Sequence, residues 1–175
     1  MAAAIQSSSK TSPGKSRSTT GKGPDAITLL KEDHRAAEKL FGQFEKAKDE
    51  NRKKAIADQV CMELRVHMQI EEEIFYPASR DVLKDDDIVD ESVVEHAAAR
   101  ELIGEIEGME PGDELYDAKV TVLQEQIEHH VEEEETELFP KVRKTDMDVK
   151  AIGARLKARK EELMGQMDGE GSAVQ

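Results

Sequence analysis

The sequence lacks several features that are typical of common protein classes. Of its 175 residues, none is tryptophan, only 3% are aromatic and five are prolines. Ala, Glu, Lys and Leu dominate instead, which favours an all-helical protein over one with sheets. The chain is long enough for one domain with a substantial hydrophobic core.

The sequence also has only one cysteine, fewer basic than acidic residues and no long apolar segment. The single cysteine, Cys61, cannot form an internal disulfide, which suits a reducing compartment and predicts a cytoplasmic protein. With 25 basic against 39 acidic residues the net charge is -14, which argues against a nucleic-acid partner because a polyanion is repelled. No run of roughly 18 apolar residues exists, so we expect no membrane span.

The first 24 residues differ in composition from the rest. They are rich in Ser, Thr, Gly, Lys and Ala, and they carry basic residues but no acid. Such a segment cannot bury enough apolar surface to fold alone, and it lacks the apolar core of a targeting peptide. We therefore divide the chain into a disordered basic tail (1–24), a main domain (25–145) and a C-terminal helix and tail (146–175).

The second half of the main domain repeats the first half around its histidines. Residues 33–42 are echoed by residues 95–104, and residues 67–77 by residues 130–140, about 62 residues later in each case. Four of the five histidines therefore occupy equivalent places in two similar units. The second histidine of each unit has a glutamate four residues on, which is a spacing of metal ligands.

Apolar residues three or four apart predict long helices throughout this region. Asp25 is the expected N-cap of the first helix, and Pro77 is expected to end the second. Short connections make neighbouring helices antiparallel, so the fold class is all-α, an up-down-up-down four-helix bundle with a short C-terminal fifth helix. The predicted helices span residues 25–48, 52–76, 86–107, 113–142 and 148–164.

The predicted bundle brings histidines and glutamates of all four helices to one depth. Residues i and i+4 lie one above the other on a helix, so a histidine and a glutamate of the same helix can bind one ion. Buried carboxylates without a cation would cost several kcal/mol each. Nitrogen and oxygen ligands without thiolate favour iron over manganese or zinc, and carboxylates can bridge two ions. The predicted metal ligands are His34, His67, Glu71, His96, His130 and Glu134.

Residues beside these ligands have several possible roles. On the fourth helix the ligand is Glu134 or Glu135, and we choose Glu134 because the repeat aligns it with Glu71. The other acids near the ligands are expected to be solvated, with some of them orienting imidazole N–H groups. His129 points about 100 degrees away from His130, which predicts a surface position. Cys61 is expected to be a packing residue.

Taken together, these motifs resemble the hemerythrin-like, or HHE cation-binding, domain over about residues 25 to 145. That pattern is one His on helix 1, His-x3-Glu on helix 2, His on helix 3, and His with a carboxylate four or five residues later on helix 4. The resemblance implies a non-haem di-iron centre, and the best known members of the family bind dioxygen reversibly. Hemerythrins proper carry a second helix 3 histidine where this chain has Arg100. We expect Arg100 to leave a position open at one iron, to swing outward, or to pair with a carboxylate such as Glu38.

The resemblance leaves three functions open. The first is a module that binds or senses dioxygen or a related small ligand at an iron with an open position. The second is a di-iron enzyme that acts on peroxide or nitric oxide. The third is an iron sensing or storage module. The sequence identifies no protein partner.

Overall fold

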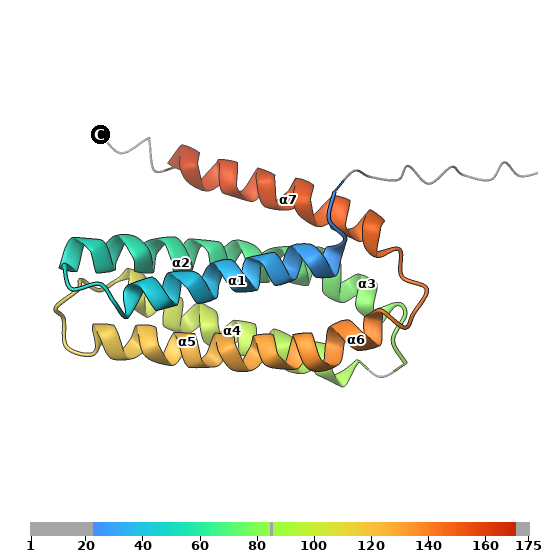
Figure 1. Ribbon diagram of the computed structural model, residues 1–175, viewed down its shortest axis with the longest axis horizontal. Helices are drawn as coiled ribbons and strands as arrows, with labels where there is room; N and C mark the ends of the chain where they lie inside the picture. The colour runs from blue at the N-terminus through green and yellow to red at the C-terminus, as the bar shows by residue number, and fades with distance from the viewer. Residues whose placement is uncertain (1–22, 85, 171–175) are drawn as a thin grey trace, which may run out of the picture.

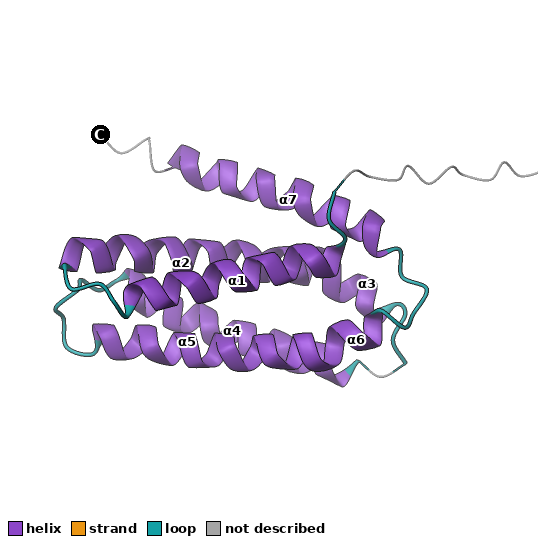
Figure 2. Cartoon of the chain, in the orientation of Figure 1, coloured by secondary structure: helices purple, strands orange, loops and turns teal. Residues whose placement is uncertain are grey.

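The computed structural model describes residues 23–84 and 86–170. Within this part of the chain all regular structure is helical, as predicted (Figure 2). Most of the predicted disordered tail, residues 1–24, lies outside the described residues. In chain order the elements are α1 (Ala26–Phe44), α2 (Glu50–Ile70), the π-helical turn η1 (Glu71–Phe75), α3 (Tyr76–Arg80), α4 (Asp87–Glu107), α5 (Tyr116–Glu133), the π-helical turn η2 (Glu134–Leu138), α6 (Phe139–Val142) and α7 (Val149–Glu170).

Four long rods make up the body of the molecule (Figure 1). The first rod is α1 and the third is α4, whereas the second joins α2 to α3 through η1 and the fourth joins α5 to α6 through η2. Each rod runs antiparallel to the one before it. The predicted up-down-up-down four-helix bundle is therefore confirmed.

Side-chain caps set where the first two rods begin. The Asp25 carboxylate accepts a hydrogen bond from the Thr28 backbone N–H at 3.1 Å, which confirms the predicted N-cap. Asp49 caps α2 in the same way through the Arg52 N–H at 2.9 Å, so α2 begins earlier than predicted. The predicted end of the first helix at Lys48 was too late, because α1 ends at Phe44 before this cap.

The prediction that Pro77 ends the second helix is wrong, because the helix continues beyond it to Arg80. A π-helical turn precedes Pro77 in the second rod and Pro140 in the fourth. In the first of these turns, the Tyr76 N–H donates to the carbonyl of Glu71, five residues earlier. In an α-helix a proline ring clashes with the carbonyl four residues earlier, and the wider turn relieves that clash. Pro140 follows η2 in the same arrangement.

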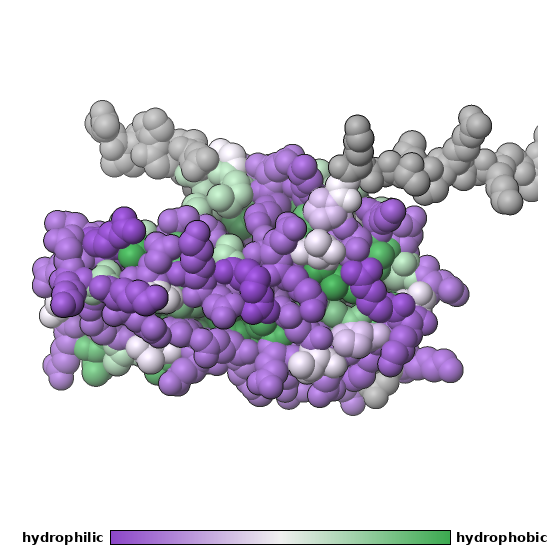
Figure 3. Space-filling model, in the orientation of Figure 1, coloured by the Kyte–Doolittle hydropathy of each residue, from purple (hydrophilic) through white to green (hydrophobic). Residues whose placement is uncertain are grey.

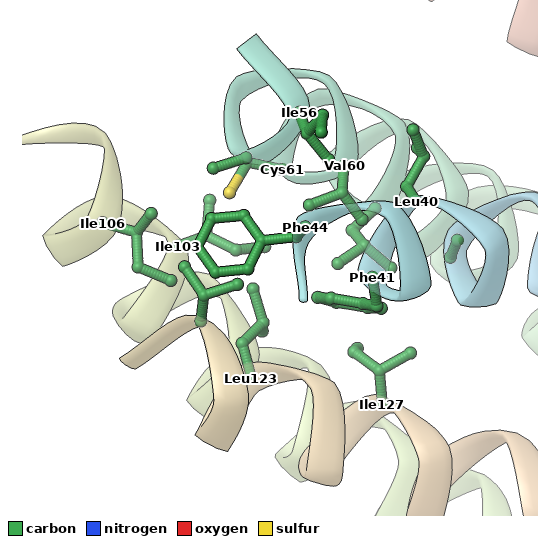
Figure 4. Packing of buried hydrophobic residues seen from close by; sticks show 14 of the residues in the cluster. Leu40, Phe41, Phe44, Ile56, Val60, Cys61, Ile103, Ile106, Leu123 and Ile127 are labelled. Carbon is green, nitrogen blue, oxygen red and sulfur yellow. The ribbon is translucent and has the colours of Figure 1, made fainter. Parts of the chain in front are cut away.

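Two apolar clusters fill the bundle, one on either side of the buried histidines along the rods. The cluster in Figure 4 packs Phe41 and Phe44 of α1 against Ile103 of α4 and Leu123 of α5. Cys61 is buried in this cluster, and burial raises the pKa of its thiol to about 12. Its predicted role as a packing residue agrees with this environment. The second cluster surrounds the two π-helical turns and includes residues of α7.

Helix α7 lies along α1 and α2, away from α4 and α5 (Figure 1). Gly153 permits this close approach, because a Cβ there would lie 2.6 Å from the Pro24 carbonyl oxygen. Helix α7 extends to Glu170, so the fifth helix is longer than the predicted 148–164 and is not short. The molecular face drawn in Figure 3 is mostly hydrophilic, and in the described residues no helix is both long and apolar enough to cross a membrane.

Candidate metal centre

Histidines and glutamates from all four rods meet in the middle of the bundle. One histidine comes from each of α1, α2, α4 and α5, and a glutamate begins each π-helical turn. All of them are buried, and none is more than 6% exposed. The structure thus brings together all the predicted ligands: His34, His67, Glu71, His96, His130 and Glu134.

These side chains form two groups of potential ligand atoms joined by carboxylates. The atoms of His34, His67, Glu71 and Glu134 lie within 4.8 Å of one another. The atoms of Glu71, His96 and His130 form a second group, and they also lie within 4.8 Å of one another. Because Glu71 belongs to both groups, one carboxylate can bridge two ions.

Individual distances show that both carboxylates reach both histidine pairs. Glu71 Oε2 lies 3.2 Å from His67 Nε2 and 3.5 Å from His96 Nε2. Glu134 Oε2 lies 3.3 Å from His34 Nε2 and 3.7 Å from His130 Nε2. Two ions, each held by a pair of histidines, would therefore share two bridging glutamates.

Several of the atoms that face this space have no hydrogen-bond partner. Within the described part of the chain, no hydrogen-bond partner exists for His34 Nε2, His67 Nε2, either oxygen of Glu71, or Glu134 Oε2. Buried polar atoms are normally paired, and leaving one unpaired costs about 1–3 kcal/mol. Converging lone pairs of nitrogen and oxygen fit a metal cation. At the other end of the centre, His96 Nε2 and His130 Nε2 lie 3.2 Å apart, within hydrogen-bonding distance.

The pKa values of Glu71 and Glu134 are both shifted by the burial of two carboxyl groups side by side. Burial, followed by repulsion from Glu134, raises the pKa of Glu71 well above its usual value. Burial would raise the pKa of Glu134 as well, but the nearby His130 and His34 lower it to about 2. The two pKa values are therefore shifted in opposite directions, as expected when two buried carboxyl groups lie close together without a cation between them. Burial also lowers the pKa of His96 to about 2, so its ring is in the neutral form that binds metal.

Each of the four histidines contacts a carboxylate through Nδ1, on the side away from the centre. Such contacts fix the orientation of a ligand imidazole and leave its Nε2 free to bind metal. The Nδ1 atoms of His34, His96 and His130 donate at 2.8–2.9 Å, and that of His67 lies 3.5 Å from its carboxylate. The pairs are His34 with Glu135, His67 with Asp33, His96 with Glu72 and His130 with Glu95. We call these four carboxylates the outer carboxylates.

The outer carboxylates follow the internal repeat. Asp33 and Glu95 each precede the first histidine of a unit and contact the second histidine of the same unit. Glu72 and Glu135 each follow one of the two buried glutamates, Glu71 and Glu134, and contact the first histidine of the other unit. The two units are therefore interlocked by reciprocal hydrogen bonds across a pseudo-twofold arrangement.

Several finer predictions can be compared with this geometry. Glu134 is fully buried among the ligand atoms, whereas Glu135 is an outer carboxylate. The side chain of His129 is 63% exposed, as expected for a surface position. Arg100 forms an ion pair with Glu72 at 2.7 Å, so the suggested pairing with Glu38 is wrong; Glu38 instead pairs with Arg35.

Tyr76 is a member of the site that the sequence reasoning missed. Its hydroxyl donates to Glu134 Oε1 at 3.1 Å and lies 3.3 Å from His96 Nε2. Burial, followed by the charges of Glu134 and Glu71, raises the pKa of Tyr76 well above its usual value, so the phenol keeps its proton. Tyr76 comes directly after η1, and its position five residues after the predicted ligand Glu71 is the signal in the sequence that could have identified it.

A small cavity adjoins the ligand atoms of His34, His67 and His130. Its volume is about 20 Å³, which is enough for one water molecule or a diatomic molecule. Five of the remaining lining residues are apolar, namely Ala37, Leu64, Met68, Ile127 and Val131, and three are charged, namely Asp33, Glu63 and Lys160. The centre thus faces a chamber that suits a small, weakly polar ligand.

A surface groove between α1 and α5 lies next to this cavity. The groove has a volume of about 310 Å³ and shares His34, Ile127 and Val131 with the cavity lining. Charged residues, among them Arg35 and Glu135, line its outer part. In Figure 3 apolar side chains are visible among the hydrophilic ones across the middle of this face. The groove therefore connects the protein surface with His34.

Comparison with known proteins adds independent information. Residues 25–142 match the family model of the hemerythrin HHE cation-binding domain. A hemerythrin HHE cation-binding domain-containing protein of Mycobacterium kansasii has a similar structure, with a TM-score of 0.74 and 23% identity over 87% of this chain and 94% of that one. A protein of Nostoc sp. described as a DNA nickase is 23% identical over 148 residues, which are 83% of this chain. The chain spans 42% of that relative's length.

Proposed function

The chain belongs to the hemerythrin HHE cation-binding domain family, and from this membership and the geometry of its centre we propose that it holds a carboxylate-bridged pair of non-haem iron ions. His34 and His67 would bind one ion, His96 and His130 the other. Glu71 and Glu134 would bridge them. Iron suits this set better than manganese or zinc, because imidazole and carboxylate are mixed without thiolate.

We further propose that the iron pair binds or senses dioxygen or a related small ligand. The observation that carries this proposal is the cavity of about 20 Å³ beside His34, His67 and His130. Its apolar lining favours a diatomic molecule over a charged or bulky one. Iron supplies reversible binding of such a ligand when an open position remains. Hemerythrins proper carry a second helix 3 histidine where this chain has Arg100, which pairs with Glu72, so we expect such a position.

The test is spectroscopic titration of the iron-loaded protein under anaerobic conditions. Addition of dioxygen should produce a visible absorption band that disappears when the gas is removed and returns on repetition. A Met68→Trp variant, designed to fill the cavity, should retain iron but bind the gas more weakly. A band of equal strength in both proteins would show that the cavity is not the ligand site.

A second candidate is an enzyme that acts on peroxide or nitric oxide. The observation favouring it is the Tyr76 hydroxyl, a buried proton donor 3.1 Å from Glu134 at one side of the centre. A positioned donor that keeps its proton at neutral pH can supply a proton to a reacting oxygen. Repeated turnover of added peroxide, with iron retained, would favour the enzyme over the binding module. An iron sensing or storage module would show neither turnover nor a reversible band.

A further inference from the structure

One of the four outer carboxylates differs from the others in its surroundings. Three of them are neutralised from outside by a lysine or an arginine. Glu95 is not: among the described residues, its ion-pair partners are His129 and His130 only. The cation partners of the other three are Lys160 for Asp33, Arg100 for Glu72, and Lys31 with Arg35 for Glu135.

Around Glu95 the side chains instead form a chelating arrangement. Glu95 Oε2 accepts from His130 Nδ1 at 2.8 Å, which holds the carboxylate in place. Its Oε1 lies 3.7 Å from His129 Nε2, and that nitrogen lies 3.5 Å from Glu133 Oε1. All three potential ligand atoms lie within 4.8 Å of one another. His129 and Glu133 are i and i+4 on α5, and Glu95 comes from α4.

The internal repeat explains why this arrangement has no counterpart in the first unit. The positions equivalent to His129 and Glu133 are Val66 and Ile70, which are fully buried in the cluster that includes α7 residues. Helix α7 covers that face and brings Lys160 to Asp33, the equivalent of Glu95. No described helix covers the corresponding face of α4 and α5 (Figure 1). The second unit thus has an exposed histidine and a partly exposed glutamate where the first has apolar packing.

We propose that Glu95, His129 and Glu133 bind a third, exchangeable divalent transition-metal ion at the surface. The ion takes the place that the Lys160 ammonium has in the first unit: it neutralises the outer carboxylate and thereby fixes the histidine behind it. For His67 that carboxylate is Asp33, and for His130 it is Glu95. The third ion therefore stabilises one histidine of the buried centre from outside.

The geometry and the donor types agree with this assignment. The nitrogen–oxygen distances of 3.5 and 3.7 Å fall within the range of 3.2–3.7 Å found in the buried centre. One imidazole and two carboxylates suit Zn²⁺ and similar ions, and three protein ligands leave a position for water. The side chain of His129 is 63% exposed, so the ion exchanges with solvent rather than being locked in.

Metal counting on the full-length, iron-loaded protein tests the proposal. Loosely held metal is first removed on a chelating resin, and the protein is then dialysed against Zn²⁺ before iron and zinc are measured. The wild type should gain about one zinc ion per chain, and Glu133→Gln and His129→Gln should gain none at the same zinc concentration. Glu128→Gln is the matched control, since it removes an exposed carboxylate of the same helix that bonds Gln124 and not the cluster. It should bind zinc as the wild type does.

The decisive quantity is the difference in total metal between wild type and Glu133→Gln. A difference of about one ion supports the site even if zinc replaces iron in the centre, because the comparison does not depend on which metal fills the buried ligands. Equal totals in the two proteins overturn the proposal. Loss of zinc from Glu128→Gln to the same extent also overturns it, because the effect would then reflect general negative charge.

Discussion

Tyr76 and Phe139 occupy equivalent positions in the two units and stack on equivalent histidines. The Tyr76 ring lies 5.5 Å from the His96 ring, and the Phe139 ring lies 5.8 Å from the His34 ring, between centroids. At this stacking position the two sides of the centre therefore differ by one hydroxyl group. That hydroxyl contacts Glu134, so only the His96 side has a proton donor built into it.

Replacing Tyr76 with phenylalanine makes the two sides alike. We expect Tyr76→Phe to fold and to retain its metal, because the ring and its stacking remain. Any peroxide turnover should fall by about 10²-fold or more, the usual contribution of a positioned acid. Steady-state peroxide assays check this, and Tyr116→Phe is the control, because Tyr116 is buried in the apolar cluster outside the centre. Unchanged turnover in Tyr76→Phe would exclude the hydroxyl as a proton donor.

Neighbouring glutamates on the fourth rod should have different effects when neutralised. Glu134→Gln removes a bridging carboxylate and should abolish binding of the metal pair. Glu135→Gln leaves the ligands in place but weakens the hydrogen bond to His34 Nδ1, so metal affinity should fall by about 10–100-fold. Competition with a chelator of known affinity measures both. Should Glu135→Gln lose metal completely while Glu134→Gln keeps it, the two roles are reversed.

Helix α7 should influence metal affinity through Lys160. This lysine pairs with Asp33, whereas the adjacent Arg159 pairs with Glu73, which has no ion pair with a histidine among the described residues. Lys160→Met should lower metal affinity by up to about fivefold, the equivalent of about 1 kcal/mol for a partly exposed pair. Arg159→Met removes a similar tie between α7 and η1 and should leave affinity unchanged. The same chelator competition compares them, and equal losses would mean that α7 acts only through packing.

The raised pKa of Glu71 gives a pH dependence to the stability of the metal-free protein. Below its usual pKa of 4.5 this carboxyl is protonated in both the folded and the unfolded state. As the pH rises above that value, the unfolded state ionises while the folded state keeps its proton, so the free energy of unfolding falls. Glu71→Gln lacks this effect and should be more stable than the metal-free wild type at pH 7, by roughly 1–3 kcal/mol.

Denaturant unfolding of both metal-free proteins at several pH values measures the effect. The difference in their free energies of unfolding should widen steadily above pH 4.5 and shrink below it. Added metal should reverse the order, because only the wild type gains stability from binding. A constant difference at all pH values would contradict the account of Glu71.

The internal repeat predicts much of the fold, whereas other parts of the centre depend on packing between rods. His67 and Glu71 are four residues apart, and on a helix this spacing alone places the two side chains next to each other. A π-helical turn shifts the helical phase by one residue, and no apolar pattern marked it at Glu71. Pro77 was therefore taken as the end of the helix, although the turn before it accommodates the ring.

The outer carboxylates show a second limit of reasoning along one helix. Asp33 adjoins His34 in the sequence, so its side chain points about 100 degrees away, and its contact with His67 exists only because α1 packs against α2. Likewise, Glu95 contacts His130 only because α4 packs against α5. The repeat aligns Asp33 with Glu95 and Glu72 with Glu135, and this pairing was the available signal. Tyr76 had no such signal, since its counterpart is a phenylalanine.

Metal content after anaerobic iron loading tests the central claim most directly. The protein is incubated with ferrous iron, passed over a chelating resin to remove exchangeable ions, and analysed for iron per chain. We predict about two iron ions per chain in the wild type and loss of this iron in Glu71→Gln and His67→Ala. Wild-type protein without iron, or variants that retain it in full, would contradict the assignment of these residues to a di-iron centre.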